Sequence, residues 1–173
     1  MGFGDRAATT VCHVSNLLIV HHSPTPAVES LTDALVTGAK DDAIEGVDVV
    51  VKPALEAGAD DVLAADGYVL LTPANFGYMS GAMKHFFDTI FLQAGGSLSD
   101  DGSAAETGEA KKPYGLLVHG RYDTTGAVRS VQGIVQALGW QQSAQVVEIL
   151  GDVGEAELER ATELGATLAA LLT

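Results

Sequence analysis

Residues 16–39 have the sequence NLLIVHHSPTPAVESLTDALVTGA, which contains an apolar run, a short polar loop and an amphipathic pattern, in that order. Residues 16–22 are apolar nearly throughout rather than at alternate positions, which predicts a strand buried on both faces. Beyond the loop, apolar residues recur at helical spacing at Val28, Leu31, Leu35 and Val36, and Gly38 follows as a stop signal. Strand, loop and helix in this order predict one crossover unit of a parallel sheet.

The same alternation continues along the chain. Apolar or β-branched runs predict further strands at residues 47–55, 67–73, 114–120 and 144–150. Helical patterns lie at residues 59–65, 79–92, 126–139 and 155–172. Five strands that alternate strictly with five helical segments predict an α/β fold with a doubly wound parallel sheet. Ligands of such sheets bind beyond the carboxyl ends of the strands, so the loops there are the candidate sites.

Composition disfavours several classes of function. The 173 residues, 47% of them hydrophobic, suit one domain; we expect residues 16–173 to form it and residues 1–15 to be a flexible extension. The formal charge of −14 disfavours nucleic acid as a partner. No run reaches the roughly 18 apolar residues of a membrane helix, so we expect no membrane insertion and a cytoplasmic location. Cys12 is the single cysteine and cannot form an internal disulfide.

Residues 93–113 form a long connection with almost no large apolar side chain. Connections of this length are binding loops, lids or disordered segments. We expect a mobile surface loop, with an ordered lid as the alternative.

The loop HHSPTPAVES, residues 21–30, has the features of a modest anion site. It lacks GxxxxGK[ST] and GxGxxG, which disfavours ATP, GTP and a dinucleotide bound in the Rossmann manner. The candidate donors are the hydroxyls of Ser23, Thr25 and Ser30 and the amides of Thr25, Ala27 and Val28. These lie near a predicted helix N-terminus, whose dipole favours an anion, and Pro26 suits the first helical turn. A plain helix cap uses the same residue types, so this loop alone leaves both interpretations open.

The loop TPANFGYMSG, after the third predicted strand, suits a planar ring. Pro73 stiffens the end of the strand, and Gly77 can adopt positive φ, which lets a flat ligand approach the backbone. Asn75, Phe76 and Tyr78 present polar and aromatic atoms at one place. We therefore expect this loop to contact a planar heteroaromatic ligand.

The segment TPANFGYMSGAMKHFFD resembles a motif of the flavodoxin-like NAD(P)H:quinone oxidoreductases and FMN reductases. The matching positions are Thr72, Pro73, Phe76, Gly77, Met79, Ser80, Gly81, Lys84, Phe86 and Asp88. The first loop resembles the FMN-phosphate loop of this family in the spacing of Ser23, Glu29 and Ser30. The resemblance implies a flavodoxin-like three-layer sandwich, a five-stranded parallel sheet of order 2-1-3-4-5 and one non-covalently bound FMN.

The resemblance also implies a set of cofactor-binding residues. These are Ser23, Thr25, Pro26, Ala27 and Val28 around the phosphate, Pro73, Ala74, Asn75, Phe76 and Gly77 around the ring, and His119, Gly120 and Arg121 in a third wall. Pro26 stands where the family often has glycine, and GRYDTTGA stands where a glycine-rich stretch is common. Arg121 and Tyr122 are candidates for a second substrate, with an ordinary loop surface as the alternative.

Other conspicuous residues have structural interpretations. We expect Phe86, Phe87 and Phe91 to lie in the core, because they fall inside a helical pattern. His21 and His22 end a strand, where successive side chains point to opposite faces, so we expect no metal site there.

The sequence therefore predicts an FMN-dependent oxidoreductase that passes reducing equivalents from NAD(P)H to a quinone or similar small acceptor. The flavin supplies the chemistry, so no catalytic side chain is assigned. A flavodoxin-type electron carrier without substrate turnover is the main alternative, because an acidic surface suits docking to basic proteins. A flavin-free relative that binds another phosphorylated ligand also stays open. The resemblance implies a homodimer or higher oligomer.

Overall fold

A computed structural model describes residues 14–94 and 111–173. The strands are β1 (Ser15–His21), β2 (Val47–Pro53), β3 (Gly67–Asn75), β4 (Tyr78–Met79), β5 (Pro113–Gly120), β6 (Gln141–Gln142) and β7 (Val147–Leu150). The helices are α1 (Pro26–Ala39), α2 (Ala59–Ala64), α3 (Gly81–Ala94), α4 (Thr125–Ala137) and α5 (Glu155–Ala170). The expectations for Cys12, for most of the N-terminal extension and for most of the connection at 93–113 lie outside the described residues.

The parallel strands follow the order β2-β1-β3-β5, and β6 and β7 both pair with β5. Since β6 pairs with the start of β5 and β7 with its end, these two strands together occupy the fifth position of the sheet. The expected flavodoxin-like order is therefore confirmed. The last strand was predicted to begin at residue 144 but begins at Val147, and the two glutamines of β6 carry no apolar signal that would predict a strand.

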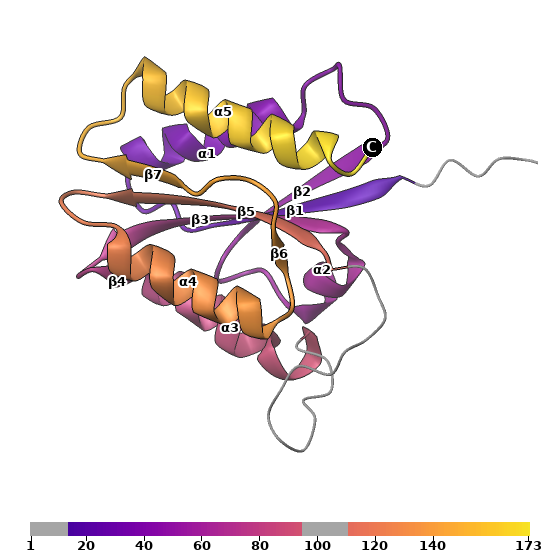
Figure 1. Ribbon diagram of the computed structural model, residues 1–173, viewed down its shortest axis with the longest axis horizontal. Coiled ribbons are helices and arrows are strands. Elements are labelled where there is room, and N and C mark those ends of the chain that lie inside the picture. Colours follow the sequence, from indigo (N-terminus) through magenta and orange to yellow (C-terminus); the bar gives the residue numbers. More distant parts are fainter. Residues whose placement is uncertain (1–13, 95–110) are drawn as a thin grey trace, which may run out of the picture.

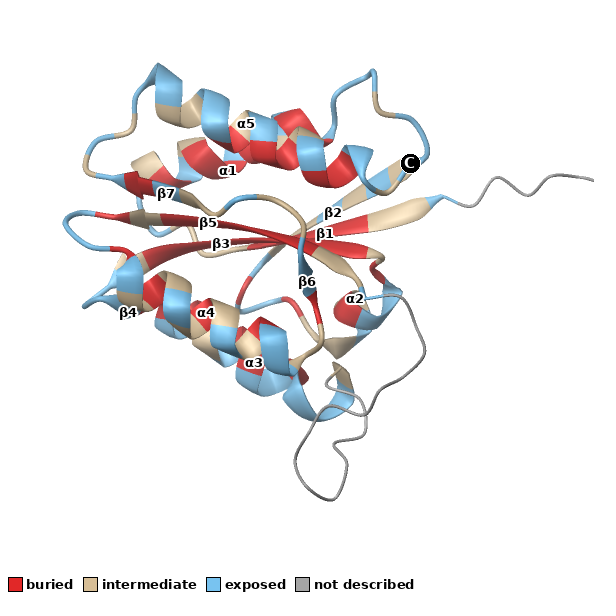
Figure 2. Ribbon diagram, viewed as in Figure 1, coloured by how far each residue is buried: buried red, intermediate tan, exposed pale blue. Residues whose placement is uncertain are grey.

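Helices cover both faces of the sheet (Figure 1). α1 and α5 lie on one face, and α2, α3 and α4 lie on the other. Side chains of β1 alternate between the two layers: Leu17 and Ile19 join the cluster under α1 and α5, while Leu18 and Val20 join the opposite one. The central strands are buried on both sides (Figure 2), as their uniformly apolar sequences predicted.

Helix α3 overturns one core prediction. Phe86 and Phe87 are buried as expected, but Phe91 is 43% exposed. The buried stripe of α3 continues from Phe86 and Phe87 to Ile90, and position 91 falls beyond it on the solvent side.

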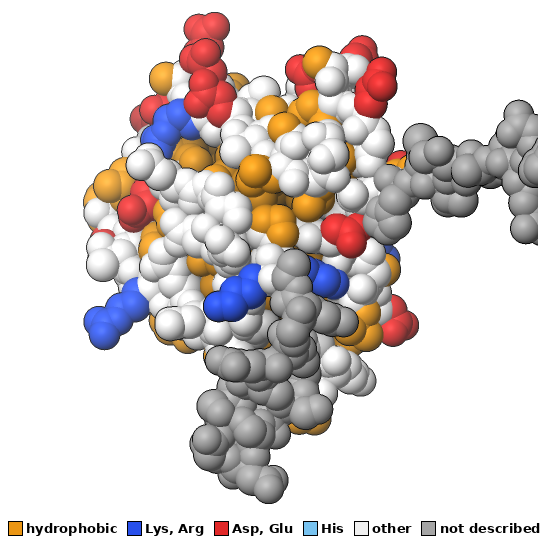
Figure 3. Space-filling view, turned by 45° about the vertical axis from the view of Figure 1, so that its right-hand side comes forward, with side chains coloured by type: hydrophobic (Ala, Val, Ile, Leu, Met, Phe, Trp, Pro, Cys, Tyr) orange, Lys and Arg blue, Asp and Glu red, His pale blue; other side chains and the backbone are white. Residues whose placement is uncertain are grey.

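The surface combines acidic and apolar regions. In Figure 3, acidic side chains gather mainly around the margin, and hydrophobic side chains are exposed between them. No helix within the described residues is long and apolar enough to cross a membrane.

Two glycines let α1 and α5 pack backbone to backbone. A Cβ atom at Gly165 would lie 2.0 Å from the carbonyl oxygen of Leu35, and one at Gly38 would lie 1.9 Å from that of Thr162. No side chain fits at such distances, so both positions require glycine. This contact fixes α1, and with it the loop that precedes α1, against the sheet.

We expect Gly165→Ala to lower the free energy of unfolding by about 2–3 kcal/mol, because overpacking costs about 1–3 kcal/mol and the obstacle here is rigid backbone. Urea unfolding followed by circular dichroism measures the change. The matched control is Gly133→Ala in α4, where an added Cβ meets nothing within 4 Å. Alanine there should stabilise the helix by about 0.5–1 kcal/mol. Similar effects at the two positions would contradict the close contact.

Candidate functional site

The carboxyl ends of β1, β3 and β5 bring three loops to one edge of the sheet, at the left of Figure 1. In the strand register His21 is opposite Leu71, and Pro73 is opposite His119. A Cβ atom on Gly120 would lie 3.3 Å from the Cβ of Ala74, so the ends of β3 and β5 are in contact. The predicted cofactor-binding residues come from the loops and strand ends at this edge and, for Pro26, Ala27 and Val28, from the first turn of α1, where the side chain of Val28 is buried in the core.

The first loop uses most of its hydroxyl groups internally. Nδ1 of His21 lies 2.9 Å from Oγ of Ser23, which lies 2.7 Å from Oγ1 of Thr32. Thr32 donates its proton to the carbonyl oxygen of Val28, so Ser23 donates to Thr32 and accepts from His21. Burial, followed by repulsion from His22, lowers the pKa of His21 and favours a neutral ring. The bond to Ser23 places the proton of this ring on Nδ1. Ser23, predicted as a ligand donor, therefore has its proton engaged within the protein.

Backbone amides remain available at the start of α1. Thr25 is the N-cap, its Oγ1 accepts from the amide of Val28 at 3.4 Å, and Pro26 begins the helix as predicted. The amides of Ser23 and Ala27, like that of Thr25, make no backbone hydrogen bond among the described residues. Because Thr25 Oγ1 accepts a bond, its own proton can point outward. The loop thus offers three amides and one hydroxyl at the positive end of α1.

His22 has an unusual environment in this loop. Its amide donates to the carbonyl oxygen of Leu71 at 3.0 Å, which holds the residue beside β3. Its side-chain Nδ1 is buried and has no hydrogen-bond partner in the described part of the chain. Burial lowers the pKa of His22, so its ring is neutral near pH 7 and one polar atom is uncompensated. From the sequence, His22 was considered only as a metal ligand. Its place directly after an apolar strand is the signal that could have identified it as a candidate ligand contact.

The second loop is a tight hairpin that the sequence did not predict. β3 continues to Asn75, turns through Phe76 and Gly77, and returns as β4, with Asn75 paired to Tyr78. The φ angles are 52° at Phe76 and 72° at Gly77, as a two-residue hairpin turn of this type requires. Positive φ was expected at Gly77 only. A bulky residue at positive φ is strained, and Phe76 is also fully exposed, so the tip is a candidate ligand contact.

Two contacts hold the hairpin in place. Oγ1 of Thr72 accepts from the amide of Ser80 at 3.0 Å across the base of the hairpin. At the tip, α4 comes so close that a Cβ atom on Gly126 would lie 1.9 Å from the carbonyl oxygen of Gly77. The exposed ring of Phe76 therefore extends from a firmly supported turn.

The third loop is tied to the loop after β7. Nε2 of His119 lies 2.8 Å from the carbonyl oxygen of Gly151, and the amide of Gly151 donates to the carbonyl oxygen of Gly120 at 2.9 Å. His119, predicted as a cofactor contact, thus has one ring nitrogen engaged by backbone. Its position at the edge is as expected, but its side chain supports the neighbouring loop.

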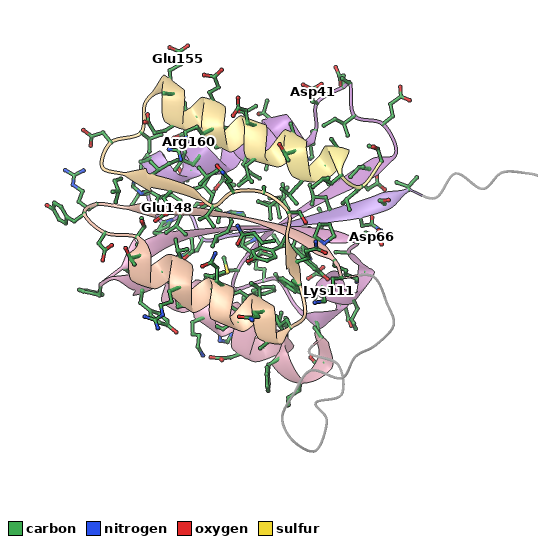
Figure 4. All side chains as sticks on the ribbon, viewed as in Figure 1. Asp41, Asp66, Lys111, Glu148, Glu155 and Arg160 are labelled. Carbon is green, nitrogen blue, oxygen red and sulfur yellow. The ribbon has the colours of Figure 1, made fainter. Side chains whose placement is uncertain are left out.

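Charged and aromatic side chains cover the outside of this third loop. Nη1 of Arg121 donates to Oδ1 of Asp152 at 3.2 Å, and both side chains are exposed. Glu148 lies on β7 near this edge (Figure 4), where its carboxylate accepts from the buried hydroxyl of Thr124. Tyr122, the next residue after Arg121, is 88% exposed.

Two hollows lie elsewhere, toward the amino ends of the strands. One, of about 100 Å³, is lined by Asn16, Leu18, Val50, Asp61, Ala64 and Ala65. The other, of about 430 Å³, lies between the end of α1 and the start of β2 and has a mainly polar lining. Neither includes a predicted site residue.

The chain matches the family model described as NADPH-dependent FMN reductase over residues 7–150. A curated flavodoxin from Aquifex aeolicus is 32% identical over 92 residues, which are 53% of this chain and 48% of that protein, so the chain spans about half the length of this relative.

Solved structures share the fold at low identity. A flavodoxin from the domain Archaea has a TM-score of 0.73 and 16% identity, with 91% of this chain and 98% of that chain covered. A flavodoxin, WrbA-like protein from Agrobacterium tumefaciens has a TM-score of 0.67 and 18% identity, with 91% and 97% covered. The family match spans all three loops at the carboxyl edge. The chain belongs to the NADPH-dependent FMN reductase family, has a flavodoxin-like fold and binds FMN.

Proposed function

We propose that this protein takes reducing equivalents from NAD(P)H and delivers them to a quinone or similar small acceptor, with FMN held at the carboxyl edge of the sheet. The observation that carries the proposal is Phe76, a fully exposed aromatic ring in a strained turn at the same edge of the sheet as the first loop. An exposed ring at positive φ is unfavourable in the unliganded protein, so a flat ligand that covers it would explain its presence.

The residues at this edge fit FMN. The amides of Ser23, Thr25 and Ala27, which make no backbone hydrogen bond among the described residues, suit a phosphate at the start of α1, and residues 21–30 contain no Lys or Arg. Nδ1 of His22, which is buried and has no partner within the described residues, suits a polar group of the ligand. Phe76 provides an aromatic surface for the ring system. The proposed binding set therefore keeps Ser23, Thr25, Pro26, Ala27 and Val28 for the phosphate and Pro73, Ala74, Asn75, Phe76 and Gly77 for the ring.

When bound, FMN supplies the electron-transfer chemistry, and the protein positions it and its substrates. We assign the amides of the hairpin tip to the polar edge of the ring, where backbone donors favour negative charge. We assign His119, Gly120 and Arg121 to the third side of the FMN site. His119 contributes by holding the neighbouring loop through its bond to Gly151.

For the second substrate, we assign Arg121 to a nucleotide phosphate and Tyr122 to stacking. Arg121 is paired with Asp152 on an exposed surface, where an ion pair is weak and a phosphate can compete for the guanidinium. Tyr122 is exposed on the same loop and presents a ring to a planar acceptor. We expect a second copy of this chain to cover the carboxyl edge of the sheet, in a homodimer or higher oligomer.

An electron carrier is the second candidate function. The charge of −14 and the match to a curated flavodoxin favour it, because an acidic carrier can dock to basic redox proteins. The two functions differ in whether NAD(P)H reacts with the flavin directly.

Rapid mixing of the FMN-loaded protein with NADPH distinguishes the two functions. We expect direct bleaching of the flavin absorbance, followed by reoxidation when a benzoquinone is added. NADH in a parallel experiment measures the choice of nucleotide. Bleaching that requires a separate reductase would refute the enzyme and favour the carrier.

Replacing Phe76 with asparagine tests the strained tip. Asparagine tolerates positive φ, so Phe76→Asn should raise the free energy of unfolding of the apoprotein by about 1 kcal/mol, and at the same time weaken FMN binding. Denaturant unfolding and fluorescence titration measure the two effects. Leu55→Asn, at another exposed apolar residue, is the control and should leave FMN affinity unchanged. Unchanged FMN affinity in Phe76→Asn would remove this ring from the proposed site.

Thr25 tests the phosphate assignment. Thr25→Ala removes the outward hydroxyl and should weaken FMN binding about tenfold, since hydrogen bonds to charged groups contribute about 1.5–3 kcal/mol. Riboflavin, which lacks the phosphate, should bind the variant and the parent equally, and Thr25→Ser should behave like the parent. Equal affinity of Thr25→Ala and the parent for FMN would indicate that this loop serves only as a helix cap.

A further inference from the structure

Nδ1 of His22 is a buried polar atom without a partner among the described residues. Such atoms are rare, because burying an unsatisfied polar group is costly. This one lies directly after β1, at the edge where the three loops meet. Its position at a candidate ligand site suggests that the missing partner belongs to a ligand.

The neighbouring polar side chains already have partners. Ser23 bonds to His21 and Thr32, and Ser30 donates to the carbonyl oxygen of Ala27. His22 is thus the one side chain of this loop with a buried atom left unsatisfied in the described structure.

The backbone places His22 shortly before the start of α1 in the chain and next to β3 in the sheet. The ring of His21 bonds to Ser23, whose hydroxyl continues to Thr32 of α1. Successive side chains of a strand alternate, so the His22 side chain leaves the backbone toward the opposite face. Its amide bond to Leu71 holds it beside β3, which continues into the hairpin. His22 therefore lies on the segment that leads from β1 to the start of α1, beside the strand that leads into the hairpin.

We propose that Nδ1 of His22 is hydrogen-bonded by the polar tail of bound FMN, and that His22 selects flavins that carry this tail. A neutral imidazole can accept from a ribityl hydroxyl through Nδ1 or, as the other tautomer, donate to a phosphate oxygen. This inference rests on the placement of FMN at the carboxyl edge proposed above.

The test compares His22→Leu and His22→Asn with the parent apoprotein. Asparagine keeps a polar atom near the position of Nδ1, whereas leucine does not. FMN, riboflavin and lumiflavin, which lacks the ribityl tail, are titrated by flavin fluorescence. We expect His22→Leu to weaken FMN binding at least tenfold, lumiflavin binding to change less than twofold, and His22→Asn to stay within threefold of the parent. His85→Leu, at an exposed histidine of α3, is the matched control and should leave all three affinities unchanged.

Stability supplies an independent readout. Removing an uncompensated atom should leave the unfolding midpoint of the apoprotein unchanged or raise it, whereas loss of a structural contact would lower it. Weaker binding of both FMN and riboflavin assigns the bond to the ribityl hydroxyls, and weaker binding of FMN alone assigns it to the phosphate. An FMN dissociation constant within twofold of the parent in His22→Leu would overturn the proposal, as would equal losses of FMN and lumiflavin.

A spectroscopic test uses the unmodified chain and does not depend on the variants folding. The ¹⁵N chemical shift of His22 Nδ1 should change when FMN binds, and an unchanged shift would overturn the proposal. All binding measurements are made without NAD(P)H or an acceptor. Failure of the proposed turnover is therefore observed separately from failure of this contact.

Discussion

Parallel pairing of β1, β3 and β5 beneath helices on both faces is the constraint that places every candidate ligand contact. The central residues of β1, Leu17 to Val20, are at most 1% exposed, so burial fixes this strand in the middle of the sheet. Parallel pairing then turns the carboxyl ends of β1, β3 and β5 to one edge. The first loop, the hairpin and the third loop are neighbours because of this arrangement, although long stretches of sequence separate them.

The fold was largely predictable because burial on two faces has a clear pattern in the sequence. The order of the strands came from the resemblance to a known family, since periodicity alone does not fix order. The missed strands β4 and β6 contain two residues each, too few to show any period. Phe91 was misplaced because a helical pattern identifies an apolar stripe less sharply at its margin than at its centre.

The candidate site was predictable as three loops, but the state of its polar atoms was not. Ser23 and Thr25 are chemically similar in the sequence, yet Ser23 gives its proton to Thr32 while Thr25 accepts a bond and keeps its own proton. His119 and His22 both lie at the end of an apolar strand, yet the ring of His119 is bonded to Gly151, while Nδ1 of His22 has no partner in the part of the chain that the structure describes. Such differences arise from contacts between distant segments, which no local pattern records.

The unfavourable features of this protein are concentrated where a ligand can offset them. Phe76 has both positive φ and a fully exposed ring, and His22 has a buried atom without a partner among residues 14–94 and 111–173. The backbone is held at both places, because Gly126 packs against the hairpin turn and the amide of His22 is bonded to β3. A ligand that satisfies both groups binds a site that is already formed, so little of its binding energy is lost in ordering the loops. The rigid contacts that maintain the strain thereby also preorganise the site.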